Sequence, residues 1–403
     1  MENRVSPKLV LAFYYPWYGN PEGPSARWFH WNSPPGVAYD EIATSTDYPL
    51  LGPYDSWDER VIRSHIAMAK AAGVDGFISS WWGIDSFEDE AFKRILRVAE
   101  RENFKVTIYY ESVRDMNRIQ IVSELSYILT RYSHNPAFLK IDGRPVVFIY
   151  AVKAMGRDLA FWTDVLKQVE ERTGIRAVYI GDTYDISFLS IFEGLHTYAP
   201  LWIDDHMSMY AEMAEKVKNY IHPEVLEKGR AARRLWCAGV IPGFDDREIR
   251  HPGTYVSRKG GRYYERIWRA AIASGADIVT ICSWNEWHEG TEIEPSREYG
   301  FEYLNLTRKF VQFYKNASVF PEIPAPRLVA SFRNNAAGTV LVLSSEGSVP
   351  AVITSLIVKY RGTVLVSHGY SLNINNVAKI IFIPYIGLNE EIALQKLFLL
   401  KDC

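Results

Sequence analysis

Residues 58–80 of the 403-residue chain have the sequence DERVIRSHIAMAKAAGVDGFISS, and this stretch contains the alternation that decides the fold. Over residues 58–72, apolar side chains recur at helical spacing, which predicts an amphipathic helix. Gly73 stands just past the expected end of this helix, where glycine commonly terminates helices. Residues 74–80 then form a short apolar run that is typical of a buried strand. The apolar face of the expected helix consists of Val61, Ile62, Ile66 and Ala69.

The same strand–helix unit recurs along the chain to about residue 316. The strand candidates are nearly continuously apolar, as parallel strands buried on both faces require. They cover residues 9–15, 74–80, 104–110, 145–151, 176–181, 192–198, 235–241 and 277–283. Helices are expected over 58–72, 88–101, 118–132, 157–172, 207–220, 263–274 and 299–316, with only a turn of helix after the fifth strand. Eight such units predict an α/β protein with a (β/α)8 (TIM) barrel.

An open, doubly wound sheet is the alternative arrangement for the same alternation. It lacks support here, because no glycine-rich dinucleotide fingerprint follows the first strand.

The character of the sequence changes near residue 320. Pro321, Pro324 and Pro326 form a linker, and short β patterns with glycine at several turns follow it. We therefore expect two domains, a barrel over residues 1–322 and a small C-terminal all-β, sandwich-like domain over 323–403. The role of the second domain is left open between carbohydrate binding and a structural or assembly function.

Charge and composition exclude several classes of protein. Lysine and arginine (45) nearly balance aspartate and glutamate (48), and no basic stripe favours nucleic acid as a partner. No apolar run approaches the roughly 20 residues that cross a membrane. Three cysteines, Cys237, Cys282 and Cys403, are too few for a disulfide framework, and the first two are expected to be buried free thiols. With no signal peptide visible, a cytoplasmic location is expected unless a leader was removed, and the oligomeric state is left open.

The expected carboxyl ends of the strands carry aromatic, carboxylate and amide side chains, and barrel enzymes build their sites at these ends. Aromatic rings pack on the C–H faces of sugars, while carboxylates and amides bond to vicinal hydroxyls, so this set favours a polyol ligand. The candidate binding residues are Tyr15, Trp17 and Trp31 after the first strand, Trp81 and Trp82 after the second, Glu111, Tyr150, Asp182 and Tyr198 after the next four, and Asn285, Trp287 and His288 after the eighth.

Glu286 and Glu289 follow the eighth strand and are the candidate catalytic carboxylates. Glycoside cleavage requires one group that protonates the leaving oxygen and a second carboxylate that assists at the anomeric centre. Bulky neighbours can desolvate the two glutamates, and their mutual repulsion can separate their pKa values. The alternative is an exposed loop pair that bonds to backbone amides.

Several segments of the chain, in this order, resemble glycoside hydrolase family 99, the endo-acting α-mannosidases and α-mannanases. The likeness covers about residues 9–316, and its most specific part is NEWHEGT at 285–291. The other segments are FYYPWYGNP at 13–21, HWN at 30–32 with Trp31 at its centre, LGPYDS at 51–56, VIRSH at 61–65 and GRYYE at 261–265.

The resemblance implies a retaining, endo-acting hydrolase of α-mannosidic, α-1,2-linked glycans on a (β/α)8 barrel, without a metal or cofactor. It implies that Glu286 acts as a base on the 2-hydroxyl of the substrate, which attacks the anomeric carbon to form a 1,2-anhydro sugar. Glu289 would be the acid and later the base. It further implies that Glu111, Tyr198 and Asn285 bind sugar hydroxyls.

The chain also departs from the family pattern. Trp81-Trp82-Gly83 replaces the expected Trp-Tyr-Pro-Pro, and the loops after the first and seventh strands diverge. Because these loops shape the sugar subsites, the sugar, the linkage and the cleavage position are left open.

Three rival functions remain at this point. A metal-dependent deacetylase or phosphoesterase would need a metal site, for which Asp204-Asp205-His206 is the one compact acid and histidine group. A transglycosylase would pass the trapped sugar to a sugar hydroxyl instead of water. A non-catalytic glycan-binding protein would keep the barrel without the chemistry.

Overall fold

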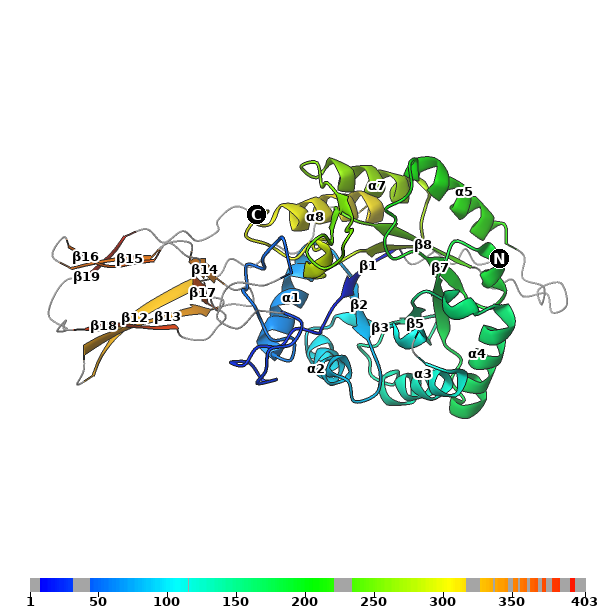
Figure 1. Ribbon diagram of the computed structural model, residues 1–403, viewed down its shortest axis with the longest axis horizontal. Coiled ribbons are helices and arrows are strands. Elements are labelled where there is room, and N and C mark those ends of the chain that lie inside the picture. The colour runs from blue at the N-terminus through cyan, green and yellow to red at the C-terminus, as the bar shows by residue number, and fades with distance from the viewer. Residues whose placement is uncertain are drawn as a thin grey trace.

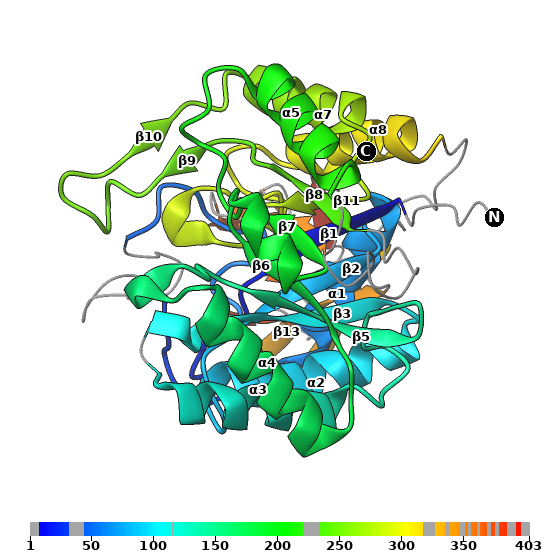
Figure 2. The same ribbon diagram turned by 90° about the vertical axis from the view of Figure 1, so that its right-hand side faces the viewer.

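The computed structural model describes residues 8–31, 44–114, 116–220 and 234–316 with their side chains, and beyond these the backbone of strands between residues 327 and 395. Eight parallel strands form one sheet in the order β3-β2-β1-β11-β8-β7-β6-β5, and pairing of β3 with β5 closes it into a barrel (Figures 1 and 2). The strands are β1 (Leu9–Tyr14), β2 (Gly76–Trp81), β3 (Lys105–Tyr110), β5 (Arg144–Ile149), β6 (Val178–Asp182), β7 (Gly194–His196), β8 (Leu235–Val240) and β11 (Ile278–Ile281).

The eight predicted barrel strands are confirmed, and their order follows the sequence. Gly76 shows why β2 pairs closely with β3, because a Cβ at this position would lie 2.6 Å from the carbonyl oxygen of Lys105. The sequence analysis did not predict three short strands, β4 (Lys140–Ile141), β9 (Phe244–Asp245) and β10 (Tyr255–Val256). The first forms a hairpin with β5, and the other two pair with each other.

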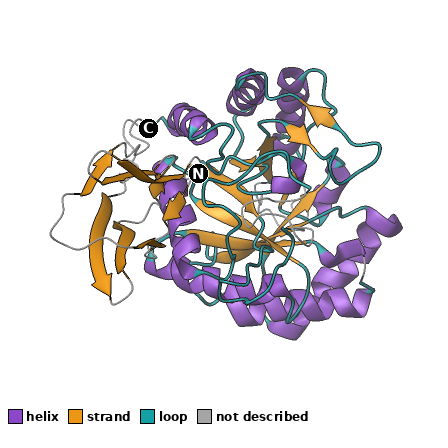
Figure 3. Cartoon of the chain, turned by 60° about the vertical axis from the view of Figure 1, so that its left-hand side comes forward, coloured by secondary structure: helices purple, strands orange, loops and turns teal. Residues whose placement is uncertain are grey.

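The described helices surround the barrel (Figure 3). Their N-termini are capped as the sequence allows, since Asp58 accepts from the Arg60 amide and Asn117 forms a capping box with Gln120. After β6 the chain makes only the 3₁₀ helix Ile186–Ser190, as predicted for the fifth connection. The α-helices are α1 (Glu59–Ala71), α2 (Phe87–Arg101), α3 (Arg118–Tyr132), α4 (Leu159–Thr173), α5 (His206–Lys218), α7 (Arg262–Ala273) and α8 (Glu302–Lys315).

Aromatic side chains fill the interior of the barrel. The Phe13 ring lies 4.6 Å from that of Tyr109 and 5.5 Å from that of His196, between centroids, and Phe148 packs against His196 at 5.3 Å. Burial lowers the pKa of His196 to about 3, so its ring is neutral here. The interior is thus a packed core, and any site for a large ligand has to lie at the mouth of the barrel.

Strands β12 to β19 follow the barrel and pair antiparallel (Figure 1). Their side chains lie outside the described residues, so the sandwich-like packing, the boundary at residue 323 and the role of the region stay predictions. The strands are β12 (Arg327–Asn335), β13 (Gly338–Glu346), β14 (Ala351–Ile353), β15 (Leu356–Tyr360), β16 (Thr363–His368), β17 (Leu372–Ile374), β18 (Lys379–Pro384) and β19 (Ile392–Gln395).

Two further expectations concern single features of the chain. Cys237 and Cys282 are buried free thiols, as predicted, while Cys403 lies outside the described residues. Within the described part of the chain, no helix combines the length and the apolar character needed to cross a membrane.

Candidate active site

The loop after β11 carries both candidate glutamates. Ser283 fixes its start, because the Ser283 Oγ accepts a hydrogen bond from the Glu286 amide at 2.8 Å. The loop then forms the short 3₁₀ helix η4 (Trp287–Glu289), and the Glu286 Oε1 accepts from the His288 amide at 3.2 Å. Gly290 ends the turn with a φ of 56°, a left-handed conformation that glycine adopts without strain. Local backbone bonds therefore orient the Glu286 carboxylate.

Glu289 has partners on two other loops of the barrel mouth. Its Oε1 accepts a charge-assisted hydrogen bond from the Arg250 Nη2 at 3.0 Å, and the Tyr198 hydroxyl lies 3.4 Å from its Oε2. The Glu289 side chain keeps 16% of its surface exposed, whereas Glu286 is almost completely buried. Glu289 is the carboxylate of the pair that can be reached from solvent.

Burial dominates the electrostatics of the pair. It raises the pKa of Glu286 well above the ordinary value, and the neighbouring Glu289 carboxylate raises it further. Burial also raises the pKa of Glu289, although the Arg250 guanidinium opposes this effect. Because the two carboxylates interact, the pair keeps one proton at pH values at which two exposed glutamates would have lost both. The pair can thus present one acid and one base at the same time.

Two more carboxylates line the mouth. Burial raises the pKa of Glu111, just beyond β3, to about 8, and the charge of Glu289 contributes to this rise. Burial raises the pKa of Asp182, at the end of β6, to about 6, although it accepts hydrogen bonds from the Ala151 and Tyr198 amides at 3.1 and 3.3 Å. Glu111 is therefore protonated at neutral pH and can donate a hydrogen bond to a ligand.

Aromatic rings form one wall of this mouth. The Trp17 ring stacks on His30 at 4.5 Å, and it lies 4.7 Å from Tyr15 and 6.5 Å from Trp82. Trp82 keeps 38% of its surface exposed, a large apolar face that is open to solvent. The Tyr150 ring lies under the Arg114 guanidinium at 5.4 Å, and its phenol is coupled electrostatically to Glu289. The structure thus brings together Glu286, Glu289, Glu111, Asp182, Tyr15, Trp17, Trp82, Tyr150 and Tyr198.

The structure places five of the predicted sugar-binding residues behind the site instead. Trp31, Trp81, Asn285 and Trp287 have no exposed surface, and His288 keeps only 6%. The Trp31 indole donates to the Tyr54 carbonyl at 2.7 Å, and the Trp81 indole donates to Asp89 at 2.9 Å. These side chains have partners inside the protein and support the wall in this conformation, so direct contact of any of them with a sugar stays a prediction.

His288 joins the loop after β11 to the backbone at His30 and Thr44. Its Nε2 lies 2.6 Å from the His30 carbonyl oxygen, and its Nδ1 lies 3.1 Å from the Thr44 hydroxyl and carbonyl oxygens. Both ring nitrogens are engaged, and burial lowers the pKa of this imidazole. His288 therefore has a structural role in this conformation.

Asn285 attaches the loop after β11 to the end of β1. Its Oδ1 accepts from the Tyr15 amide at 2.7 Å, and its Nδ2 donates to the Tyr15 carbonyl at 3.0 Å and to the Tyr54 hydroxyl at 2.9 Å. Both amide hydrogens are thus used within the protein. The predicted contact of Asn285 with a sugar hydroxyl would require this arrangement to change.

The Tyr54 hydroxyl is the centre of a buried network under the loop. Besides the bond from Asn285, it accepts from the Trp287 indole at 3.2 Å and donates to the Glu294 Oε2 at 2.9 Å. The other oxygen of Glu294 lies 3.0 Å from the Nε2 of His65 on α1. A single hydroxyl therefore joins the loop to a fully buried carboxylate and histidine.

Tyr54→Phe is expected to reduce kcat by about 10- to 100-fold, because small displacements of a catalytic group are costly. The substitution leaves two buried donors and one carboxylate oxygen without a partner, which costs about 1–3 kcal/mol each. Tyr264→Phe is the matched control, since the fully buried Tyr264 hydroxyl bonds to Thr307 at 2.9 Å on the helical exterior. Steady-state kinetics and urea unfolding separate the two effects. Equal kcat values for both variants would contradict a positioning role of Tyr54.

Arg258 holds the other end of the loop. Its guanidinium donates to the Glu292 carbonyl at 2.9 Å and to the Gly290 carbonyl at 3.1 Å, and it forms an ion pair with the Glu292 carboxylate. Asp47 lies 3.6 Å away on the same guanidinium. Arg258 and Tyr54 thus fix the two ends of the segment that contains both glutamates.

Sequence reasoning missed the residues that reach the site from elsewhere in the chain. Tyr54 lies within the segment LGPYDS at 51–56, but nothing in the local sequence shows that its hydroxyl reaches Asn285. Arg250 precedes Glu289 by 39 positions in a divergent loop, and only its i,i+4 spacing from Asp246 was visible. Trp202, in the loop after β7, keeps 80% of its surface exposed and was not among the predicted binding residues.

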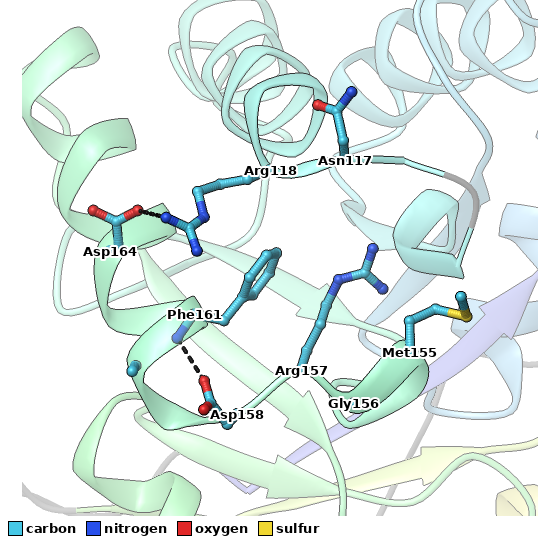
Figure 4. Close-up of a pocket in the computed structure, with 9 residues that line it drawn as sticks. Asn117, Arg118, Met155, Gly156, Arg157, Asp158, Phe161 and Asp164 are labelled. Atoms are coloured by element: carbon cyan, nitrogen blue, oxygen red, sulfur yellow. Dashed lines mark hydrogen bonds and ion pairs between the residues drawn. The ribbon is translucent and has the colours of Figure 1, made fainter.

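A cavity of about 590 Å³ lies at the N-termini of α3 and α4 (Figure 4). Its charged groups are already engaged, since Arg118 pairs with Asp164 at 2.9 Å and Arg157 donates to the Met116 carbonyl at 2.6 Å. Both guanidiniums lie over the Phe161 ring, at 5.3 and 5.2 Å from its centroid. None of the predicted site residues lines this cavity, so it is separate from the candidate active site.

The rival metal site has a structural explanation. Asp205 caps α5 by accepting from the Met207 and Ser208 amides, and the buried His206 bonds to the Pro200 carbonyl oxygen at 2.9 Å. Across the described ranges, no group of three or more His, Cys, Asp or Glu side chains is arranged to hold a metal ion.

The chain is similar to several known proteins. A family profile described as Glycosyl hydrolase family 99 matches residues 6–318. The glycoprotein endo-alpha-1,2-mannosidase of Rattus norvegicus is 29% identical over 363 residues, covering 76% of this chain and 75% of the relative. The glycoprotein endo-alpha-1,2-mannosidase-like protein of Homo sapiens is 28% identical over 357 residues, covering 75% of each.

A solved structure is similar in both sequence and fold. The family 99 endo-alpha-mannosidase from Bacteroides thetaiotaomicron, in complex with bis-tris-propane, has a TM-score of 0.65 and 27% identity to this chain. The alignment covers 77% of this chain and 98% of that structure. The residues matched by the family profile, 6–318, include the barrel and the loop that carries the two glutamates.

Proposed function

Because the chain belongs to glycoside hydrolase family 99, we propose that it cleaves α-mannosidic glycans at internal positions, with α-1,2 linkages as the preferred bond. The observation that carries this proposal is the buried, coupled pair Glu286 and Glu289 at the mouth of the barrel. The names of the relatives, endo-alpha-1,2-mannosidase in rat and endo-alpha-mannosidase in Bacteroides, supply the class of glycan and the internal position.

In the proposed first step, Glu286 takes the proton of the substrate 2-hydroxyl, and that oxygen attacks the anomeric carbon. The bond to the leaving sugar breaks as Glu289 donates its proton to the leaving oxygen, and a 1,2-anhydro sugar forms. In the second step, Glu289 takes a proton from water, the water oxygen opens the strained ring at the anomeric carbon, and Glu286 returns its proton to the 2-oxygen. Two inversions at one carbon give net retention.

The accessibility of the two glutamates supports this division of tasks, although burial and the Glu289 carboxylate favour the protonated form of Glu286 before a substrate binds. Glu286 is the more buried and is oriented by the His288 amide, as suits a base that acts on a bound sugar. Glu289 is the more exposed, as suits a group that must meet both a leaving sugar and a water molecule. The protonated Glu111 supports binding, because it can donate to a hydroxyl oxygen of the reacting sugar.

The proposal is tested with a panel of α-linked mannan and N-glycan fragments whose products are identified by mass. We expect oligosaccharide products from α-1,2-linked substrates, because the Trp17 and Trp82 rings, 6.5 Å apart, can stack against further sugars of the chain. Release of mannose alone from chain ends, or no cleavage of any α-mannoside, would contradict the proposal. A second arm with acceptor glycans present separates hydrolysis from transfer, since a transglycosylase would yield products longer than the substrate.

A further inference from the structure

The loop between β9 and β10 brings a cation to Glu289. Arg250 contacts Glu289 at 3.0 Å with one terminal nitrogen and Asp246 at 2.6 Å with the other. The Arg250 side chain keeps 51% of its surface exposed, while that of Asp246 keeps only 5%. The guanidinium therefore bridges the buried Asp246 carboxylate and Glu289, the proposed acid.

The loop holds Arg250 in a defined place. The Arg250 amide donates to the Asp246 carbonyl at 2.9 Å, which makes one turn of helix and brings the side chain back onto the Asp246 carboxylate. Asp246 in turn accepts from the Thr254 amide across the loop at 2.5 Å. The position of the cation is thus set by the backbone of the loop as well as by its contact with Glu289.

We propose that Arg250 is a positioning residue that sets the charge state of Glu289, stabilising the carboxylate form that must take a proton from water in the second step. The proposal rests on the proposed function. Glu289 lies among the carboxyl groups of the mouth, so a cation fixed 3.0 Å from its carboxylate has a large effect there.

The groups that face Glu289 come from several elements. Arg250 and Asp246 approach it from the β9–β10 loop, and the directions of their effects are opposite, since the cation lowers the pKa of Glu289 and the carboxylate raises it. The other titratable groups coupled to it are Glu286 on its own loop, Glu111 after β3, Cys282 after β11, and the phenols of Tyr15, Tyr150 and Tyr198.

The direction of the pKa changes follows from the positive charge of Arg250. Arg250 lowers the pKa of Glu289 and, from a greater distance, that of Glu286. Its removal raises both pKa values, so the loss of rate on the acid side and the loss on the alkaline side both move to higher pH. Because Arg250 contacts Glu289 directly, the alkaline limb, where the general acid loses its proton, moves furthest.

The experiment compares pH profiles of kcat/KM for the full-length wild type, Arg250→Gln and Arg250→Lys. We expect Arg250→Gln to shift the alkaline limb upward by about 1 pH unit, as removal of a contacting opposite charge does. Arg250→Lys keeps the charge and should restore the wild-type position. Arg247→Gln is the matched control on the same loop, because Arg247 pairs with Asp245 at 2.7 Å and stacks on Tyr255.

The pH profiles of these variants distinguish a charge-setting role of Arg250 from a purely structural one. An unshifted profile for Arg250→Gln, even with a lower rate, would overturn the proposal and leave Arg250 with a structural role. An equal shift for Arg250→Lys or for Arg247→Gln would also overturn it, because the charge at this position would not be the cause. Loss of all activity in Arg250→Gln would do the same, since a charge-setting residue moves the profile without abolishing it. An inactive wild type refutes the proposed function instead, so the two failures are distinguishable.

Discussion

Glu286→Gln is expected to lower kcat on an α-1,2-linked mannan oligosaccharide by about 10²- to 10⁴-fold, the range of a lost general base. The glutamine amide can still occupy the space, but it cannot take the proton of the 2-hydroxyl. The loss of kcat should be as large on a substrate with a good aryl leaving group. Even when the leaving group departs easily, the 2-oxygen still has to attack the anomeric carbon. Steady-state rates on both substrates provide the measurement.

The control for this variant is Glu124→Gln. Glu124 is a buried glutamate on α3 whose carboxylate accepts from the Tyr110 hydroxyl at 2.6 Å, outside the catalytic pair. It should retain kcat within about threefold, as substitutions away from reacting groups do. Wild-type rates for Glu286→Gln on either substrate would contradict the assignment of Glu286 as the base.

Glu289→Gln is expected to show a different pattern of loss. On the natural glycan it lacks the proton for the leaving oxygen, so kcat should fall by about 10²- to 10⁴-fold. On an activated aryl substrate the first step needs less protonation, so the loss should be at least about tenfold smaller there. The ratio of the two losses, measured for each glutamate variant, assigns the acid. Equal losses for Glu289→Gln on both substrates would remove it from that role.

The barrel could be predicted from the sequence because its signal is local and repeated. The helix over Glu59–Ala71 and the strand that follows it each have their own periodicity and their own terminating residues. The same holds for the other units, so only the strand ends moved by one or a few residues. Short pairings such as β9 with β10 were missed, since two residues are too few for a periodic signal.

The direction of a side chain at the end of a strand could not be predicted in the same way. Trp81 and Trp82 are adjacent and chemically identical, yet the first is fully buried and the second is 38% exposed. Neighbouring residues of an extended chain point to opposite faces, and the sequence does not say which face meets the mouth. Trp31 and Trp287 were also candidates for sugar contact, and tertiary packing leaves neither of them any exposed surface in this conformation.

Long-range partners were also beyond the sequence. Glu286 and Glu289 could be selected because they follow the last strand of the barrel, where chemistry concentrates. Arg250, Tyr54 and Arg258 reach this loop from other connections through bonds to atoms far away in the chain. Such contacts depend on the folded backbone, and no spacing rule connects their residues in advance.

The most direct test of the proposed mechanism is the anomeric configuration of the first product. Proton NMR can monitor it during hydrolysis of an α-1,2-linked mannan oligosaccharide by the wild-type protein. We expect cleavage within the glycan chain, with the new reducing end appearing first as the α anomer, before mutarotation mixes the two forms. Initial appearance of the β anomer would contradict it, because a single inversion leaves no place for attack by the substrate's own 2-hydroxyl.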